Sequence, residues 1–156
     1  MAYNEKFLRR AIELSICNIE KGGGPFGAII VKDGKIIAEG VNRVTTDNDP
    51  TAHAEINAIR KASAVLGTFN LSSCELYSSC EPCPMCLSAI YWAHIDNLYY
   101  SNTKNDAKAI GFDDSFIYDE LNLPCHERRL KTRQYLSEEA IVAFERWKNK
   151  EDKTAY

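Results

Sequence analysis

The chain has 156 residues, a length typical of one globular domain. Its hydrophobic content of 45% and charged content of 26% are ordinary for a globular protein, and no stretch approaches the roughly 18 consecutive apolar residues of a transmembrane helix. The net charge is −3 and Lys and Arg form no large cluster, which argues against a surface for a polyanion. We therefore expect neither a nucleic acid nor a membrane as partner.

The first residues lead into a charged amphipathic pattern and not into the apolar core of a secretory signal, which favours a cytoplasmic location. In a reducing compartment, six cysteines indicate metal binding or buried thiols more than disulfides. Three of them have no motif partner and are expected to be small buried side chains: Cys17, Cys74 and Cys125.

The first third of the chain predicts a helix followed by a β-hairpin. Asn4 is a favourable N-cap for a helix that continues to about Lys21, where three glycines end it. Apolar runs at 28–31 and 36–38 flank Asp33-Gly34, a dipeptide that favours a tight hairpin turn. Two antiparallel strands are therefore expected after the first helix.

The middle third alternates helices and strands. A helix is expected from His53 to Gly67, a strand over 74–78, a helix that begins at the Cys83 motif, and a strand over 95–100. A hairpin followed by strand–helix–strand alternation is typical of an α/β fold with helices on both faces of a mixed sheet. We predict a three-layer α/β/α sandwich with a mixed five-stranded sheet.

The last third has weaker patterns. A short helix is expected at 115–121, a strand at Arg129–Leu136 would complete the five, and Ser137 can cap a final amphipathic helix. No internal repeat or linker interrupts the chain, so residues 1–156 are expected to form one domain.

Two cysteines at a helix start indicate a metal site. Cys83 and Cys86 are three apart, so both lie on one helical face, and the partial positive charge of the helix N-terminus favours their thiolates. Pro84 is suited to the first helical turn. His53 opens another helix and can supply a third ligand. Three protein ligands leave one position open, as in catalytic zinc sites, and we expect one zinc ion per chain.

Glu55 is the candidate proton carrier. Residues two apart on a regular helix point to different sides, so Glu55 is expected beside the metal without binding it. The pattern H-x-E…P-C-x-x-C is the signature of zinc deaminases, in which the Glu is the general acid and base. His53-Ala54-Glu55 and Pro82–Cys86 match this pattern.

From the hairpin to about residue 100, the chain resembles the cytidine and nucleobase deaminase superfamily. Over nearly the whole length it is similar to the small bacterial guanine deaminases. The closer resemblance depends on four stretches and the last residue: Gly24–Ala28, Asn48–Glu55, Tyr91–Ala93, Gly111–Phe116 and Tyr156. It implies a cytidine deaminase-like fold and hydrolysis of guanine to xanthine and ammonia by a zinc-activated water.

The resemblance also implies a set of substrate-binding residues: Asn42, Phe26, Ala54, Asp114, Tyr156 and Trp92. Asn42 would hydrogen-bond the purine, Phe26 would stack on it, and the Ala54 N–H would donate from its helix start. Asp114 would accept from guanine N–H groups or join the proton relay. Tyr156 would close the site of the partner subunit in a homodimer with swapped C-terminal segments.

Other functions remain open at this stage. Guanosine, cytosine and tRNA-adenosine deaminases share the same two metal-site pieces, although the sequence pI of about 5.6 weighs against tRNA. A non-enzymatic alternative uses Cys80, Cys83 and Cys86 in a closed structural zinc site or an iron–sulfur module. The iron–sulfur run requires its next cysteine where Ile90 stands. The closed zinc site requires Cys80 as a ligand.

Overall fold

A computed structural model describes residues 3–156. The chain divides into two compact units, the first ending at Asp114 and the second spanning Ser115–Tyr156. Within the described residues, no helix has both the length and the apolar character needed to cross a membrane.

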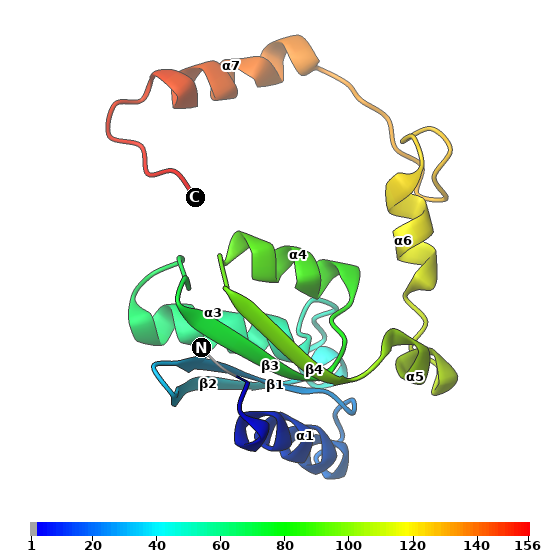
Figure 1. Cartoon of the computed structure of the whole chain (residues 1–156). Helices are drawn as coiled ribbons and strands as arrows, with labels where there is room; N and C mark the ends of the chain where they lie inside the picture. Colours follow the sequence, from blue (N-terminus) through cyan, green and yellow to red (C-terminus); the bar gives the residue numbers. More distant parts are fainter. Residues whose placement is uncertain (1–2) are drawn as a thin grey trace. The chain divides into compact units, whose positions relative to one another are not determined.

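The first unit is built on a four-stranded mixed sheet in the order β2-β1-β3-β4 (Figure 1). The strands are β1 (Gly27–Lys32), β2 (Lys35–Val41), β3 (Cys74–Cys80) and β4 (Asn97–Asn102). β1 pairs antiparallel with β2 and with β3, whereas β3 and β4 are parallel. The mixed sheet is confirmed, with four strands in the described residues instead of five.

The predicted fifth strand is absent from the described residues. The strand expected at Arg129–Leu136 is wrong, because residues 129–136 form no strand and are all exposed. A strand is stable only with a neighbour to pair with. The second unit, to which this segment belongs, offers helices as its regular elements and no strand.

Helices cover both faces of the sheet, as predicted for an α/β/α sandwich. α1 (Glu5–Glu20) lies on one face, and α3 (Ala54–Leu66) and α4 (Pro84–Trp92) lie on the other (Figure 1). The side chain of Asn4 caps α1 by accepting from the Lys6 N–H over 3.0 Å. The first helix therefore begins where the sequence predicts it.

The hairpin forms around the predicted turn. Asp33 and Gly34 have φ values of 50° and 71°, the left-handed geometry of a two-residue hairpin turn. Two short helices complete the first unit, α2 (Val44–Asp47) and α5 (Lys104–Ala109). Neither was expected, and α5 begins with a capping box at Thr103.

The second unit consists of α6 (Ser115–Asn122) and α7 (Ser137–Asn149) with their connections. Both helices were expected. None of the side chains in residues 115–156 is buried. Local order comes from contacts such as that of Arg129, which stacks 5.8 Å above the ring centroid of Phe116.

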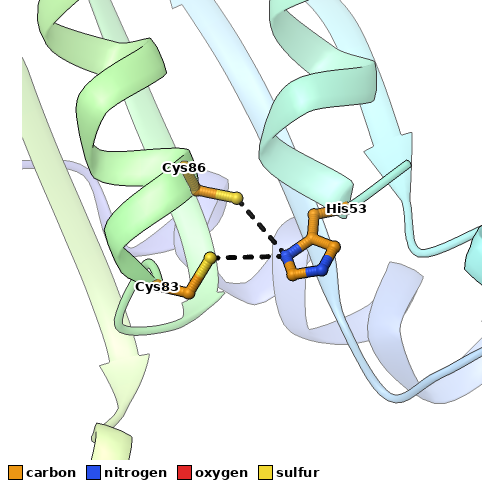
Figure 2. Close-up of side chains that lie close together, drawn as sticks. All are labelled: His53, Cys83 and Cys86. Atoms are coloured by element: carbon orange, nitrogen blue, oxygen red, sulfur yellow. Dashed lines mark hydrogen bonds between the residues drawn. The ribbon is translucent and has the colours of Figure 1, made fainter. Parts of the chain in front are cut away.

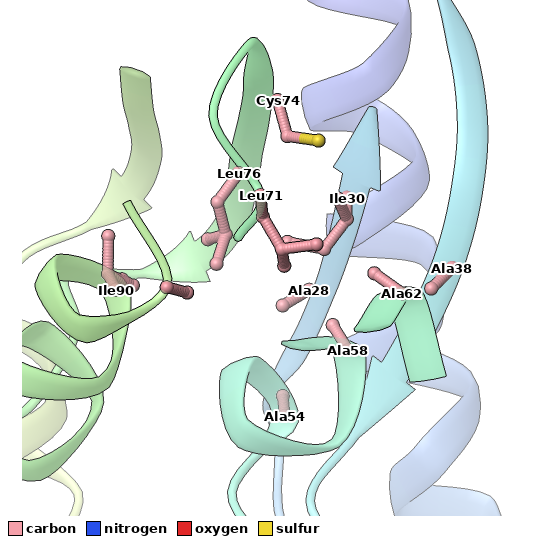
Figure 3. Packing of buried hydrophobic residues seen from close by; sticks show 11 residues of the cluster. Ala28, Ile30, Ala38, Ala54, Ala58, Ala62, Leu71, Cys74, Leu76 and Ile90 are labelled. Atoms are coloured by element: carbon pink, nitrogen blue, oxygen red, sulfur yellow. The ribbon is translucent and has the colours of Figure 1, made fainter. Parts of the chain in front are cut away.

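The main hydrophobic core lies between the sheet and the helices α3 and α4, and Figure 3 shows how its side chains pack. Three alanines of α3, Ala54, Ala58 and Ala62, are fully buried there. Gly40 of β2 permits this close approach, because a Cβ at this position would lie 2.1 Å from the Ala54 carbonyl oxygen. The start of α3 is therefore held tightly against the end of the hairpin.

Of the three cysteines outside the motif that were expected to be buried, one is buried. Cys74 is buried in the main core, but Cys17 and Cys125 are exposed. α1 buries the line of Ala11 and Asn18, and the helical period turns Cys17 away from that line.

Candidate active site

Three metal-ligating atoms meet at the N-termini of α3 and α4. Nδ1 of His53 lies 3.5 Å from Sγ of Cys83 and 3.5 Å from Sγ of Cys86, and all three atoms lie within 4.8 Å of one another. Figure 2 shows both sulfur atoms facing this nitrogen. Bonds of about 2.3 Å to sulfur and about 2.0 Å to nitrogen, at a tetrahedral angle, separate such atoms by about 3.5 Å. The three residues therefore fit a zinc ion.

Helix starts position these ligands. His53 is the N-cap of α3 and Cys83 is the N-cap of α4, both with extended backbone, and Pro84 is the first residue of α4. Cys86 follows within the first turn of α4, on the same side as Cys83. The sequence interval between the two segments is bridged by β3, which feeds directly into the cysteine motif.

The two thiols interact strongly. Contact with the Cys86 thiol, supported by the contact with His53, lowers the pKa of Cys83 to about 4. The neighbouring Cys83, together with burial, raises the pKa of Cys86. The contact with Cys83 also raises the pKa of His53. Cys83 is therefore the thiol that carries negative charge near neutral pH, which suits a divalent cation.

Glu55 lies beside the ligands without being one of them. Its residue exposure is 6%, and its Oε2 accepts from Sγ of Cys86 over 3.4 Å. Burial raises the pKa of its carboxyl group. The sequence predicted that His53 and Glu55 point to different sides of a helix. They do not, because His53 is an extended cap residue outside the helix, and both side chains contact Cys86.

Ser78 holds the other oxygen of this carboxylate and was missed in the sequence. Its Oγ donates to Oε1 of Glu55 over 3.1 Å. Ser78 is 2% exposed and shares a face of β3 with Leu76, which packs in the core beneath α3. A hydroxyl at the end of a buried strand needs a partner, and this was the signal available in the sequence.

Two of the predicted substrate residues lie where β1 begins and β2 ends. Phe26 precedes β1 and packs edge-to-face on Phe112, with ring centroids 4.9 Å apart. Asn42 follows β2, is 8% exposed, and accepts from the Val44 N–H over 3.3 Å. Phe112 was not singled out in the sequence, although it stands in the Gly111–Phe116 stretch.

The other four predicted substrate residues lie at different distances along the chain from the metal ligands, in α3, in α4 and near the start and end of the second unit. Ala54 is the first residue of α3, where the helix offers its N–H no acceptor. Burial, and then the negative charge of Cys83, raise the pKa of Asp114, which ends the first unit. Trp92 ends α4, at the opposite end of that helix from Cys83. Tyr156 belongs to the second unit, and its role stays a prediction.

Cys80 is not part of the ligand group. Its Sγ donates to the Thr103 carbonyl over 3.7 Å, and burial raises its pKa to about 11. In residues 3–156, the group of ligand atoms within metal-binding range includes His53, Cys83 and Cys86 and leaves Cys80 out. This placement counts against a closed zinc site and against an iron–sulfur module.

The chain is similar to known proteins over most of its length. Residues 1–102 match the family model of the cytidine and deoxycytidylate deaminase zinc-binding region. The chain is 54% identical to a guanine deaminase of Bacillus subtilis over 98% of this chain and 99% of that protein. A crystal structure of the Bacillus subtilis guanine deaminase superposes with a TM-score of 0.96 at 53% identity, covering 99% of both chains.

More distant relatives include a second guanine deaminase and a tRNA-specific adenosine deaminase. A guanine deaminase from Nitrosomonas europaea superposes with a TM-score of 0.69 at 39% identity, covering 73% of this chain and 66% of that one. A tRNA-specific adenosine deaminase of Aquifex aeolicus is 40% identical over 87% of both chains. Because the family model matches residues 1–102, well over half of the chain, the chain belongs to the cytidine and deoxycytidylate deaminase family of zinc-binding proteins.

Proposed function

We propose that this protein hydrolyses guanine to xanthine and ammonia, with Glu55 as its proton carrier. One observation carries the proposal: a buried carboxylate lies 3.4 Å from a metal-ligating thiol and is not itself a ligand. The full-length similarity to a guanine deaminase supports guanine over other bases.

His53, Cys83 and Cys86 would hold one zinc ion per chain. Bound zinc supplies the Lewis acidity that makes a water nucleophilic near neutral pH. The chain's own residues then move protons. Glu55 accepts the first proton of the attacking water and delivers it to a ring nitrogen, while the water oxygen adds to the carbon bearing the amino group.

Glu55 then carries the second proton. It takes the proton of the new hydroxyl group to the amino group, the bond from carbon to that nitrogen breaks so that ammonia leaves, and the hydroxyl oxygen becomes a new carbonyl oxygen. The hydrogen bond from Ser78 over 3.1 Å holds the carboxylate in place through both transfers. Water contributes the oxygen and both protons, so the reaction balances as guanine plus water giving xanthine plus ammonia.

The base would be bound by residues around the start of β1 and the end of β2. Phe26 would stack on the purine, and the Asn42 amide and the Ala54 N–H would hydrogen-bond its polar edge. Asp114 would accept from the guanine N–H groups. Trp92 remains a lining candidate, with less support because it lies at the far end of α4.

The second unit would complete the site in a homodimer. We propose that residues 115–156 exchange between two subunits and bring Tyr156 over the partner's base. Support comes from α7, whose apolar side chains are at least 46% exposed at Ile141, Phe144 and Trp147. The whole chain would then be one deaminase domain.

We also propose a cytoplasmic location, because a reducing compartment suits six free cysteines.

Ammonia release by the zinc-loaded protein tests the function. Guanine, guanosine, cytosine and a tRNA anticodon stem-loop are compared at equal concentration, and turnover of guanine is expected. Turnover of another substrate without guanine would contradict the substrate assignment and retain the zinc chemistry. Light scattering after size-exclusion chromatography tests the homodimer, for which twice the chain mass of 17.6 kDa is expected.

A further inference from the structure

Two asparagine side chains fasten the end of β2, one from each face of the sheet. From α1, Nδ2 of Asn18 donates to the Gly24 carbonyl over 2.8 Å and to the Asn42 carbonyl over 2.8 Å. Asn18 is 6% exposed. Both N–H groups of its amide are thus engaged with backbone atoms of the segments that carry the proposed base-binding residues.

These bonds close a ring of hydrogen bonds. The Phe26 N–H donates to the Gly24 carbonyl over 2.8 Å, and the Asn42 N–H donates to the Phe26 carbonyl over 3.1 Å. Asn18 joins the two ends of this path, because it donates to both Gly24 and Asn42. The Asn18 amide therefore supports, from the α1 side, the direct backbone contact between Phe26 and Asn42.

The chain leaves little room around that amide. A Cβ at Gly23 would lie 2.2 Å from Nδ2 of Asn18. The Gly23 N–H also donates to the Asn18 backbone carbonyl over 2.9 Å, which fixes the loop against the end of α1. The absence of a side chain at Gly23 therefore leaves the space that the Asn18 amide occupies.

We propose that Asn18 is a positioning residue for substrate recognition, which sets Phe26 and Asn42 at the spacing that a purine base requires. It rests on the proposed function, because that function assigns Phe26 and Asn42 to the base. Without the two donors, the Gly24 and Asn42 carbonyls each lose one partner, and the two segments lose the link through α1 that supports their direct bond from the Asn42 N–H to the Phe26 carbonyl. Asn18 acts through these residues and does not itself contact the base.

Asn57 is a matched control for Asn18, because its amide donates to the carbonyl of Val41, the residue before Asn42. From α3, its Nδ2 donates to the Val41 carbonyl over 2.9 Å and to the Ala52 carbonyl over 3.3 Å. Ala52 immediately precedes His53. This amide therefore fastens the metal side of the site, whereas Asn18 fastens the base side.

The replacement Asn18→Asp tests the proposal, since it preserves the shape and removes both donors. We expect the KM for guanine to rise about tenfold, the effect of losing roughly one positioned hydrogen bond, with kcat within about twofold of wild type. The dissociation constant of 8-azaguanine, a guanine analogue, should rise by the same factor. Zinc affinity, measured by chelator competition, should not change.

Asn57→Asp should give the reverse pattern, with zinc affinity lowered about tenfold as expected for a group that orients a ligand segment. Its KM, measured with zinc in excess, should stay near the wild-type value. An unchanged KM in Asn18→Asp would overturn the proposal. So would a loss of zinc affinity equal to that of Asn57→Asp, since Asn18 would then be a general support of the fold.

Gly23→Ala is a second test that leaves Asn18 in place and displaces its amide. Gly23 does not have a left-handed φ, so alanine adds no backbone strain there. The same rise in KM is expected, and this variant decides the matter if Asn18→Asp does not fold. If wild type acts on another base, the KM ratios are measured with that base, which separates failure of this proposal from failure of the substrate assignment.

Discussion

Glu55 accepts a hydrogen bond from Cys86 over 3.4 Å, yet it lies outside the group of atoms positioned to bind metal. A carboxylate at this distance can reach the same reacting atoms as the metal without occupying the metal's open coordination position. Its second oxygen is held by a serine from β3. Metal binding and proton transfer are therefore assigned to separate residues, and mutations can separate the two.

Replacing Glu55 with glutamine removes the proton carrier and preserves the shape of the side chain. We expect kcat for guanine to fall about 10³-fold, within the range of general acid–base catalysis. Zinc content, measured by atomic emission, should stay near one per chain. Loss of zinc in this variant would show that Glu55 supports the metal site directly.

The cysteines at 80 and 83 form a matched pair for the metal site. Cys83→Ser should lose most of its zinc, because a ligand thiolate is replaced by a hydroxyl. Cys80→Ser should keep its zinc, because Sγ of Cys80 is directed to the Thr103 carbonyl instead. Both variants are assayed by zinc content and by thermal unfolding, and equal metal loss would revive the closed-site alternative.

The ion pair between α1 and β2 predicts a pH dependence of stability. Arg10 binds both carboxylate oxygens of Glu39, over 2.7 and 2.9 Å, and this contact lowers the pKa of Glu39 below its usual value of 4.5. A lowered folded-state pKa means that the pair stabilises the protein above pH 4.5 and that the contribution is lost as the pH falls below this value.

Arg10→Gln should therefore lower the free energy of unfolding by about 0.5–1 kcal/mol at pH 7, an amount kept small by solvent screening. The difference from wild type should shrink steadily below pH 4.5. The measurement is urea unfolding over a pH series. Arg9→Gln is the control, because its partner Glu5 is an exposed neighbour on the same helix turn and should contribute less.

The contact between α3 and the hairpin predicts a steric effect. Gly40→Ala places a Cβ 2.1 Å from the Ala54 carbonyl oxygen and 2.6 Å from the Ala58 nitrogen. We expect a loss of about 2–3 kcal/mol of unfolding free energy, because a rigid backbone cannot yield to it. Gly34→Ala, at φ +71° with open space around it, should lose only about 1 kcal/mol.

Local signals in the sequence were sufficient for most of the fold. The Asn4 cap and the Asp33-Gly34 turn depend on neighbours in the chain, and the structure confirms both. Arg129–Leu136 failed as a strand because pairing depends on a partner that local pattern cannot supply. The capping box of Thr103 and Asp106 was a local signal that was overlooked.

The candidate site was predictable where a spacing carries chemistry. His53, Cys83 and Cys86 meet as their spacing and helix starts indicated. Ser78 and Asn18 could not be found in this way, because each matters through a tertiary hydrogen bond to a segment more than twenty residues away or across a loop.

The second unit has a consequence for the lifetime of the protein. None of its side chains is buried, and a helix such as α7 is marginal in water without a surface to cover its apolar side. Proteases cleave segments of this kind first. In the proposed homodimer this apolar side would be covered, so a chain that has not assembled should be cut within residues 115–156 while its sheet is still folded.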